Sequence, residues 1–202
     1  MSAHLRFIYG TMSSSKTLRL LTTAYDFEEK GIQFMVLKPS RDTRDGEGII
    51  RSRAGLERKC VSIDDDLNLY EAIKAYSLVL RSQFQELKWV LIDECQFLSE
   101  EQVDQLSDVV DFLDINVLCY GLRTDFQTRS FPASRRLFEL ADDIEEVKST
   151  CGVCGARKTS INARIDKDGN CVTDGDQILV GGNDKYRPMC RKCWKRLTRN
   201  EG

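Results

Sequence analysis

Residues 10–17 read Gly-Thr-Met-Ser-Ser-Ser-Lys-Thr and directly follow the apolar run at residues 5–9. They nearly match the pattern G-x-x-x-x-G-K-[ST], in which a strand leads through a loop into a helix and backbone N–H groups of the loop converge on phosphate. The alternative is an ordinary strand–turn–helix with a serine cap. Because a cap does not require lysine followed by threonine, the segment favours an α/β fold built around a phosphate-binding loop.

One position departs from the pattern, because Ser15 stands where the second glycine belongs. If the loop needs a left-handed backbone there, a side chain costs about 1 kcal/mol or more. We therefore expect a weakened or slightly rearranged loop that still binds nucleotide. Within it, we expect Lys16 to reach the β- and γ-phosphates and the Thr17 hydroxyl to ligate Mg²⁺.

An acidic pair, Asp93 and Glu94, follows the apolar residues 89–92. A pair of this kind after a buried strand resembles a Walker B element, whose aspartate holds Mg²⁺ opposite the phosphate loop. Taken alone, the pair is better explained as the polar start of a loop. The presence of both motifs, about 80 residues apart, favours a nucleotide site.

Predicted strands and helices alternate along the first three-quarters of the chain. This alternation predicts an α/β, P-loop (RecA-like) fold, which is a mostly parallel sheet with helices on both faces and ligands beyond the carboxyl ends of the strands. The polar, glycine-containing residues 40–55 are predicted to form a mobile loop. Strands are expected at residues 5–9, 33–37, 89–92 and 117–120, and helices at residues 16–30, 69–84 and 133–141, with a further helix from the capping box of Ser99 and Gln102 to about residue 112.

Four of the eight cysteines form two C-x-x-C pairs that are about 35 residues apart. In a reducing compartment this spacing favours a metal over disulfides, and four thiolates make a closed, structural zinc site. Four unligated thiols are the weaker alternative, and the long segment between the pairs fits either a lid or a plain zinc-ribbon hairpin. We predict a nucleotide-binding domain at residues 1–147 and a zinc-binding lasso domain at residues 148–202. The predicted zinc ligands are Cys151, Cys154, Cys190 and Cys193.

Charge and hydropathy limit the remaining classes. The net charge is only −2, which gives the chain no overall attraction to nucleic acid. Basic residues at 187–199 could bind nucleic acid on a zinc ribbon, although a solvated helix end explains them better. The chain has neither an apolar run near the roughly 20 residues of a membrane span nor a signal peptide. We therefore expect a cytoplasmic protein without membrane association or stable nucleic-acid binding.

Four further segments make the combination of motifs specific, at residues 38–44, 93–97, 120–126 and 180–186. In these segments, in residues 12–17 and in the paired cysteines, the chain resembles the type II thymidine kinases, small deoxynucleoside kinases with a zinc-bound lasso. The resemblance runs from residue 6 to about residue 194.

The resemblance implies ATP-dependent phosphorylation of the thymidine 5′-hydroxyl in nucleotide salvage. It implies that Glu94 is the general base and that Lys16 and Arg44 are the other catalytic residues. The implied Mg²⁺ ligands are Thr17, Asp42 and Asp93. The implied ATP-binding residues are Gly10, Thr11, Met12, Ser13, Ser14, Ser15, Lys16, Thr17, Asp93, Glu94, Cys95 and Gln96.

The resemblance also implies a nucleoside site in which backbone amides of the lasso read the thymine edge. Since a hydrogen-bonding site rejects a mismatched edge better than an apolar pocket rejects one methyl group, deoxyuridine should be accepted and deoxycytidine refused. A homotetramer is implied, as is inhibition by dTTP that occupies the substrate and phosphate sites together. The implied nucleoside-binding residues are Phe97, Leu122, Phe126, Phe131, Gln177, Ile178, Leu179, Val180, Gly181 and Tyr186.

Two other functions compete with a kinase. Residues 93–96 are similar to the acidic boxes of helicase-type motors, which would make the chain a nucleic-acid-stimulated ATPase with a zinc ribbon. A motor usually needs a second recognition domain, for which the chain has no room. The other competitor is a nucleotide sensor whose loop Ser15 has disabled. The co-occurrence of the lasso with Asp42 and Arg44 favours the kinase.

Overall fold

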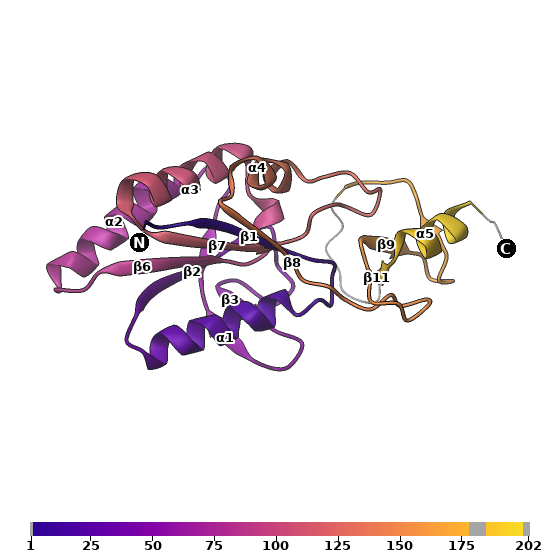
Figure 1. Ribbon diagram of the computed structural model, residues 1–202, viewed down its shortest axis with the longest axis horizontal. Coiled ribbons are helices and arrows are strands. Elements are labelled where there is room, and N and C mark those ends of the chain that lie inside the picture. The colour runs from indigo at the N-terminus through magenta and orange to yellow at the C-terminus, as the bar shows by residue number, and fades with distance from the viewer. Residues whose placement is uncertain (1, 178–184, 200–202) are drawn as a thin grey trace.

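A parallel β-sheet forms the centre of the computed structural model, which describes residues 2–177 and 185–199 (Figure 1). In the described part of the chain this sheet has six strands in the order β5-β2-β6-β7-β1-β8, and every neighbouring pair is parallel. The predicted α/β class is therefore confirmed. The strands are β1 (Leu5–Tyr9), β2 (Gln33–Pro39), β5 (Val61–Ile63), β6 (Leu87–Ile92), β7 (Asn116–Gly121) and β8 (Asp143–Glu146).

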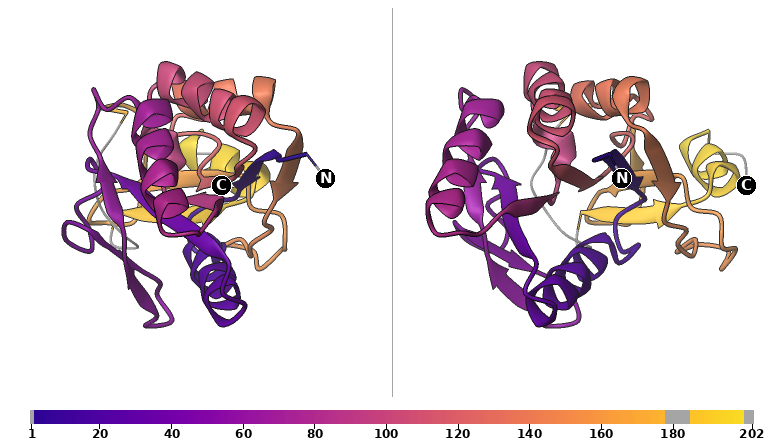
Figure 2. Two further views of the ribbon diagram at one scale, coloured as in Figure 1. Left: turned by 90° about the vertical axis from the view of Figure 1, so that its left-hand side faces the viewer. Right: turned by 60° about the vertical axis from the view of Figure 1, so that its left-hand side comes forward.

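Helices cover both faces of the sheet, with α1 on one face and α2, α3 and α4 on the other (Figures 1 and 2). Successive side chains of β6 alternate between the faces. Leu91 packs in the core beneath α1, whereas Val90 and Ile92 belong to the larger core beneath α2 and α3. None of the described helices is long and apolar enough to cross a membrane. The four helices are α1 (Lys16–Glu29), α2 (Leu69–Ser82), α3 (Glu100–Leu113) and α4 (Pro132–Leu140).

Local sequence sets the ends of two of these helices. The predicted capping box starts α3, because the Ser99 side chain accepts from the Gln102 backbone N–H and the Gln102 side chain accepts from that of Ser99. Helix α1 ends just before Gly31, whose φ of 66° is readily adopted only by glycine. Because a short loop leads from the end of β1 directly into α1, the N-terminus of α1 lies at the carboxyl edge of the sheet.

The structure corrects the prediction of a loop at residues 40–55. Strand β3 (Ile49–Arg51) lies inside this segment and pairs antiparallel with β4 (Glu57–Lys59). Ile50 is buried in the core beneath α1, and it anchors the hairpin against the main sheet. A three-residue strand among charged residues is too short to produce a readable alternation. The edge strand β8 was missed for the same reason, because its sequence is mostly acidic.

The C-terminal segment forms a second, smaller sheet with its own core. This sheet has the order β10-β9-β11 in the described residues, and both pairings are antiparallel. Figure 1 shows it at one end of the main sheet, with α5 alongside. The predicted lasso residues Ile178, Leu179, Val180 and Gly181 lie outside the described residues. The elements are β9 (Ile161–Ile165), β10 (Cys171–Val172), β11 (Tyr186–Met189) and α5 (Arg191–Thr198).

Candidate active site

The loop between β1 and α1 and the acidic pair after β6 meet at the carboxyl edge of the sheet. The Thr17 hydroxyl donates a hydrogen bond of 3.0 Å to Oδ2 of Asp93. Lys16 is buried, and its ammonium group donates to the carbonyl oxygens of Gly10 (3.0 Å) and Thr11 (2.9 Å). The loop thus closes around the lysine that the sequence assigned to the phosphates.

The loop contains two serines in the left-handed backbone region. The φ angle is 61° at Ser13 and 64° at Ser15. Such a backbone costs a residue with a side chain about 1–2 kcal/mol. Ser15 stands where the pattern has its second glycine, and its backbone has the conformation that glycine adopts most easily. Serine adopts this conformation at an energetic cost.

An arginine from the segment after β2 connects Glu94 with Asp42. Arg44 donates through Nε to Oδ1 of Asp42 at 2.6 Å, and through Nη2 to Oε1 of Glu94. Gln96 donates to the other oxygen of Glu94 at 2.6 Å. Glu94 itself has a φ of 51° and precedes the short 3-10 helix η1 (Cys95–Phe97). Strained residues of this kind cluster at functional sites.

The adjacent carboxylates have opposite pKa shifts. Burial raises the pKa of Asp93, and the negative charge of Glu94 adds to this effect. Burial would also raise the pKa of Glu94, but Arg44 and Lys16 outweigh it, so that this pKa lies below its ordinary value. Burial lowers the pKa of Lys16. Glu94 is therefore ionised at neutral pH, whereas Asp93 is a buried carboxylate that a cation would stabilise.

A cavity of about 700 Å³ extends along the phosphate loop. This volume is in the range of pockets that bind nucleotide-sized ligands. Sequence reasoning missed one of its walls, the tip of the β3–β4 hairpin, where Arg53 donates a 2.5 Å hydrogen bond to the Ser13 hydroxyl. The arginines within residues 40–55 were the available signal. The lining residues are Met12, Ser13, Ser14, Ser15, Lys16, Thr17, Leu18, Arg44, Asp45, Arg51, Ser52, Arg53, Ala54, Asp93, Glu94 and Leu122.

A second cavity, of about 50 Å³, lies next to the first and is mostly apolar. It is smaller than typical ligand pockets, so a ligand the size of a nucleoside would fit only if some of the side chains around it moved. Glu94 and Arg44 line both cavities. Six predicted nucleoside-binding residues line this space, namely Phe97, Leu122, Phe126, Phe131, Gln177 and Tyr186, together with Met12, Asp42, Arg44, Glu94, Gln96, Thr124, Asp125 and Asn162. Of these, Thr124, Asp125 and Asn162 were missed.

Four predicted ATP-binding residues do not line the larger cavity, namely Gly10, Thr11, Cys95 and Gln96. Gly10 and Thr11 line a separate small cavity. Gln96 lines the apolar cavity instead, and its side chain accepts a hydrogen bond from the Leu122 backbone N–H at 3.0 Å. Cys95 is fully buried in the main core. The structure therefore brings the loop, Asp93 and Glu94 together, but it separates Cys95 from the space along the loop.

An arginine that sequence reasoning missed contacts two of the aromatic side chains that line the apolar cavity. Arg164, on β9, is buried with its guanidinium 3.7 Å from the centre of the Phe126 ring. The same group donates to the Asp176 carbonyl oxygen at 2.8 Å and to the Tyr186 hydroxyl at 3.0 Å. Arg164 thus holds two lining rings, and its position in a short strand gave no sequence signal.

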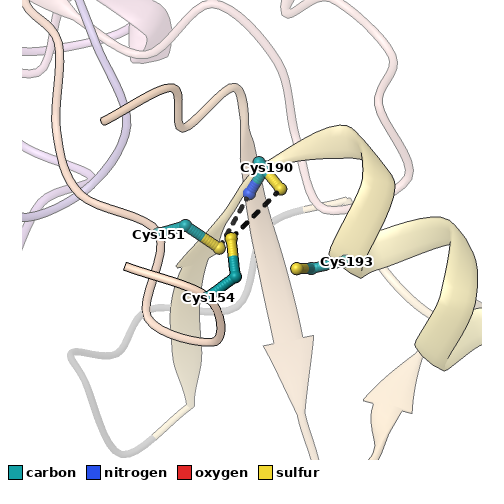
Figure 3. Close-up of side chains that lie close together, drawn as sticks. All are labelled: Cys151, Cys154, Cys190 and Cys193. Atoms are coloured by element: carbon teal, nitrogen blue, oxygen red, sulfur yellow. Dashed lines mark hydrogen bonds between the residues drawn. The ribbon is translucent and has the colours of Figure 1, made fainter. Parts of the chain in front are cut away.

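The four cysteines of the C-x-x-C pairs converge in the C-terminal segment of the chain (Figure 3). Their Sγ atoms all lie within 4.8 Å of one another, and those of Cys154 and Cys190 are 3.9 Å apart. A tetrahedral zinc ion with Zn–S bonds of about 2.3 Å needs sulfur atoms about 3.8 Å apart. The Cys190 backbone N–H also donates to the sulfur of Cys151 at 3.2 Å. The arrangement therefore fits the predicted structural zinc site.

The parallel sheet, the loop after β1 and the acidic pair after β6 define a P-loop α/β protein. Among known proteins, the family model described as "Thymidine kinase" matches residues 3–194. A protein named thymidine kinase from Mannheimia succiniciproducens is 43% identical to this chain over 196 residues, which are 97% of this chain and 97% of its own length. One from Legionella pneumophila is 42% identical over 194 residues, which are 96% of this chain and 90% of its own length. That of Streptococcus agalactiae is 41% identical over 190 residues, 94% of this chain and 96% of its own. The chain belongs to the thymidine kinase family.

Proposed function

We propose that this protein transfers the γ-phosphoryl group of ATP to the 5′-hydroxyl of thymidine, the activity that the names of its relatives indicate. The observation that carries the proposal is the position of Glu94, which lines both the cavity along the phosphate loop and the apolar cavity beside it. An ionised carboxylate at this junction can accept the proton of a substrate hydroxyl in one cavity while the oxygen of that hydroxyl attacks a phosphate in the other.

In this proposal the catalytic residues exchange partners when substrates bind. Lys16 leaves the carbonyl oxygens of Gly10 and Thr11 for the phosphates, because an ammonium pairs more strongly with an anion than with a neutral acceptor. Arg44 turns from Glu94 toward the γ-phosphate and frees that carboxylate to accept a proton. Thr17, Asp42 and Asp93 would hold Mg²⁺, which supplies positive charge near the transferred group.

The apolar cavity would hold the nucleoside. The rings of Phe97 and Phe131, whose centres are 6.2 Å apart, provide flat apolar surfaces for a pyrimidine base. Asp125 fixes the Gln177 side chain through a 2.9 Å hydrogen bond, at the point where the chain enters the predicted lasso. Backbone amides of residues 178–181 would then read the thymine edge. A site of this kind accepts deoxyuridine and refuses deoxycytidine.

We also propose that zinc bound by the four cysteines holds the domain at residues 148–202 to its fold, while residues 1–147 form the nucleotide-binding domain. A closed four-thiolate shell is structural, since it leaves no position for a substrate. Metal binding in such small domains contributes on the order of 10 kcal/mol to folding.

Regulation and assembly follow from the resemblance. We propose inhibition by dTTP, supported by the two cavities sharing Met12, Arg44, Glu94 and Leu122, because one ligand that spans both would exclude both substrates. We also propose a homotetramer in the cytoplasm, and sedimentation analysis of the purified protein tests the number of subunits.

A panel of nucleosides with ATP and Mg²⁺, with the products identified by mass, tests the proposed function. We expect phosphorylated thymidine and deoxyuridine but no phosphorylated deoxycytidine. ATP hydrolysis that requires DNA and ignores thymidine would instead favour the ATPase. Binding of nucleotide without any thymidine-dependent release of ADP would favour the sensor.

A further inference from the structure

The phosphate loop contacts the C-terminal domain through two buried hydrogen bonds. The Met12 backbone N–H donates to Oδ1 of Asn162 at 2.7 Å. The hydroxyl groups of Thr11 and Thr159 lie 2.9 Å apart. Asn162 belongs to β9, and Thr159 precedes that strand by two residues. Thus side chains about 150 residues further along the chain hold two consecutive loop residues.

These contacts act on the part of the loop that is strained. The two bonded residues directly precede Ser13, and Ser15 follows two positions later, both with a left-handed backbone. Such conformations persist only where the surroundings determine them. The hydrogen bond from the Met12 N–H fixes the peptide plane between Thr11 and Met12, directly before the left-handed residues. It therefore limits the directions in which the N–H groups that follow can point toward a phosphate.

The same strand is connected to the cysteine cluster. The Ser160 backbone N–H donates to the Met189 carbonyl oxygen at 3.1 Å, and β9 pairs with β11 along its length. Cys190 directly follows Met189. One strand pair therefore connects the four sulfur atoms to the residues that hold the loop.

We propose that the C-terminal domain positions the phosphate loop for nucleotide binding, with Thr159 and Asn162 as the positioning residues. This inference rests on the proposed function, in which the loop binds the phosphates of ATP. The domain then serves both substrates, because it lines the nucleoside cavity with Asn162 and Tyr186 and sets the shape of the loop from the other side.

Thr159→Val tests the proposal, because it removes the hydroxyl and nearly preserves the volume. We expect the dissociation constant for MgATP to rise about three- to tenfold, as the loss of one buried hydrogen bond would produce. The KM for thymidine should change less than about twofold. Thr159→Ser retains a hydroxyl and should restore ATP binding. Thr198→Val is the matched control, because within the described residues its hydroxyl donates to two carbonyl groups of α5 itself.

Amide hydrogen exchange gives a readout that does not depend on activity. In Asn162→Ala, exchange at the Met12 amide should become faster while amides of β6 and β7 keep their protection. Chelation of zinc from the wild-type protein should have the same local effect, and this measurement remains available if a variant does not fold. Wild-type MgATP affinity in Thr159→Val, or unchanged exchange at Met12 after chelation, would overturn the positioning role. A wild-type protein that does not bind MgATP would instead refute the proposed function.

Discussion

The two cavities at the carboxyl edge of the sheet are built from different chemistry. The larger is lined by the phosphate loop and by cationic side chains such as Lys16 and Arg53, whereas the exposed surface of the smaller is mostly apolar and includes rings such as Phe97 and Phe126. Only the larger suits a polyanion, and only the smaller suits a base. Glu94 and Arg44 belong to both, so the difference identifies the place where a reaction between the two ligands can occur.

Glu94→Gln should have the largest effect, because it alters the residue that both cavities share. The amide keeps the size of the side chain but cannot accept the hydroxyl proton. We expect kcat to fall about 10²- to 10⁴-fold, with small changes in the dissociation constants of thymidine and ATP. Glu145→Gln on β8, whose carboxylate pairs with Arg19 away from both cavities, is the matched control. Wild-type kcat in Glu94→Gln would exclude Glu94 as the base.

Arg164→Gln should affect the nucleoside cavity alone. It removes the cation over Phe126 and the hydrogen bonds to Asp176 and Tyr186. The loss of one cation–π contact and two hydrogen bonds should raise the KM for thymidine about tenfold or more. Steady-state kinetics should show the KM for ATP unchanged, as it should be in the exposed control Arg196→Gln. Equal increases in both KM values would mean that the two cavities are not separate in their energetics.

Arg44→Met should change the pH dependence at the shared position. Arg44 holds the pKa of Glu94 below its ordinary value, so the wild-type carboxylate stays ionised as pH falls to that low pKa. Without the cation, burial dominates and raises the pKa. The protonated fraction of Glu94 in the variant then grows as pH decreases from neutrality. Burial raises the pKa of Asp93 to about 7, which already gives the wild-type profile of kcat/KM against pH an acidic limb. In the variant this limb should become steeper, because Glu94 titrates in the same range. Acidic limbs of equal slope in both proteins would contradict the assigned ion pair.

Ser15→Gly should produce the smallest effect, confined to the larger cavity. Glycine adopts the φ of 64° without the cost that serine incurs. We expect unfolding to become harder by about 1 kcal/mol and the KM for ATP to fall a few-fold. Ser107→Gly within α3 provides a control of opposite sign, since glycine destabilises a helix interior by about 1 kcal/mol. Thermal denaturation that showed Ser15→Gly to be less stable than wild type would mean that the loop is not strained.

The features that could be predicted from sequence share a local origin. The loop at residues 10–17, the acidic pair at 93–94 and the cysteine pairs each have their chemistry within a few consecutive residues. The capping box of α3 and the alternation of strands and helices are likewise local, and the structure confirms them.

The features that escaped prediction depend on distant contacts. Arg164 gains its position from Phe126 and Tyr186, and Asn162 from Met12, none of them a close neighbour in sequence. The β3–β4 hairpin is too short to show a pattern, because one buried isoleucine among charged residues resembles a loop. Neither propensity nor periodicity contains this information, which arises only when the chain is folded.

In the proposed function Glu94 stands between the hydroxyl group of one ligand and the phosphate chain of the other. A crystal structure with thymidine, which keeps its free 5′-hydroxyl, and a non-hydrolysable ATP analogue would show whether it does. We predict that the thymidine 5′-oxygen lies within hydrogen-bonding distance of Glu94 and that the phosphates lie along residues 10–17. Phosphates bound away from this loop, or a thymidine whose 5′-oxygen is remote from Glu94, would show that Glu94 is not the base.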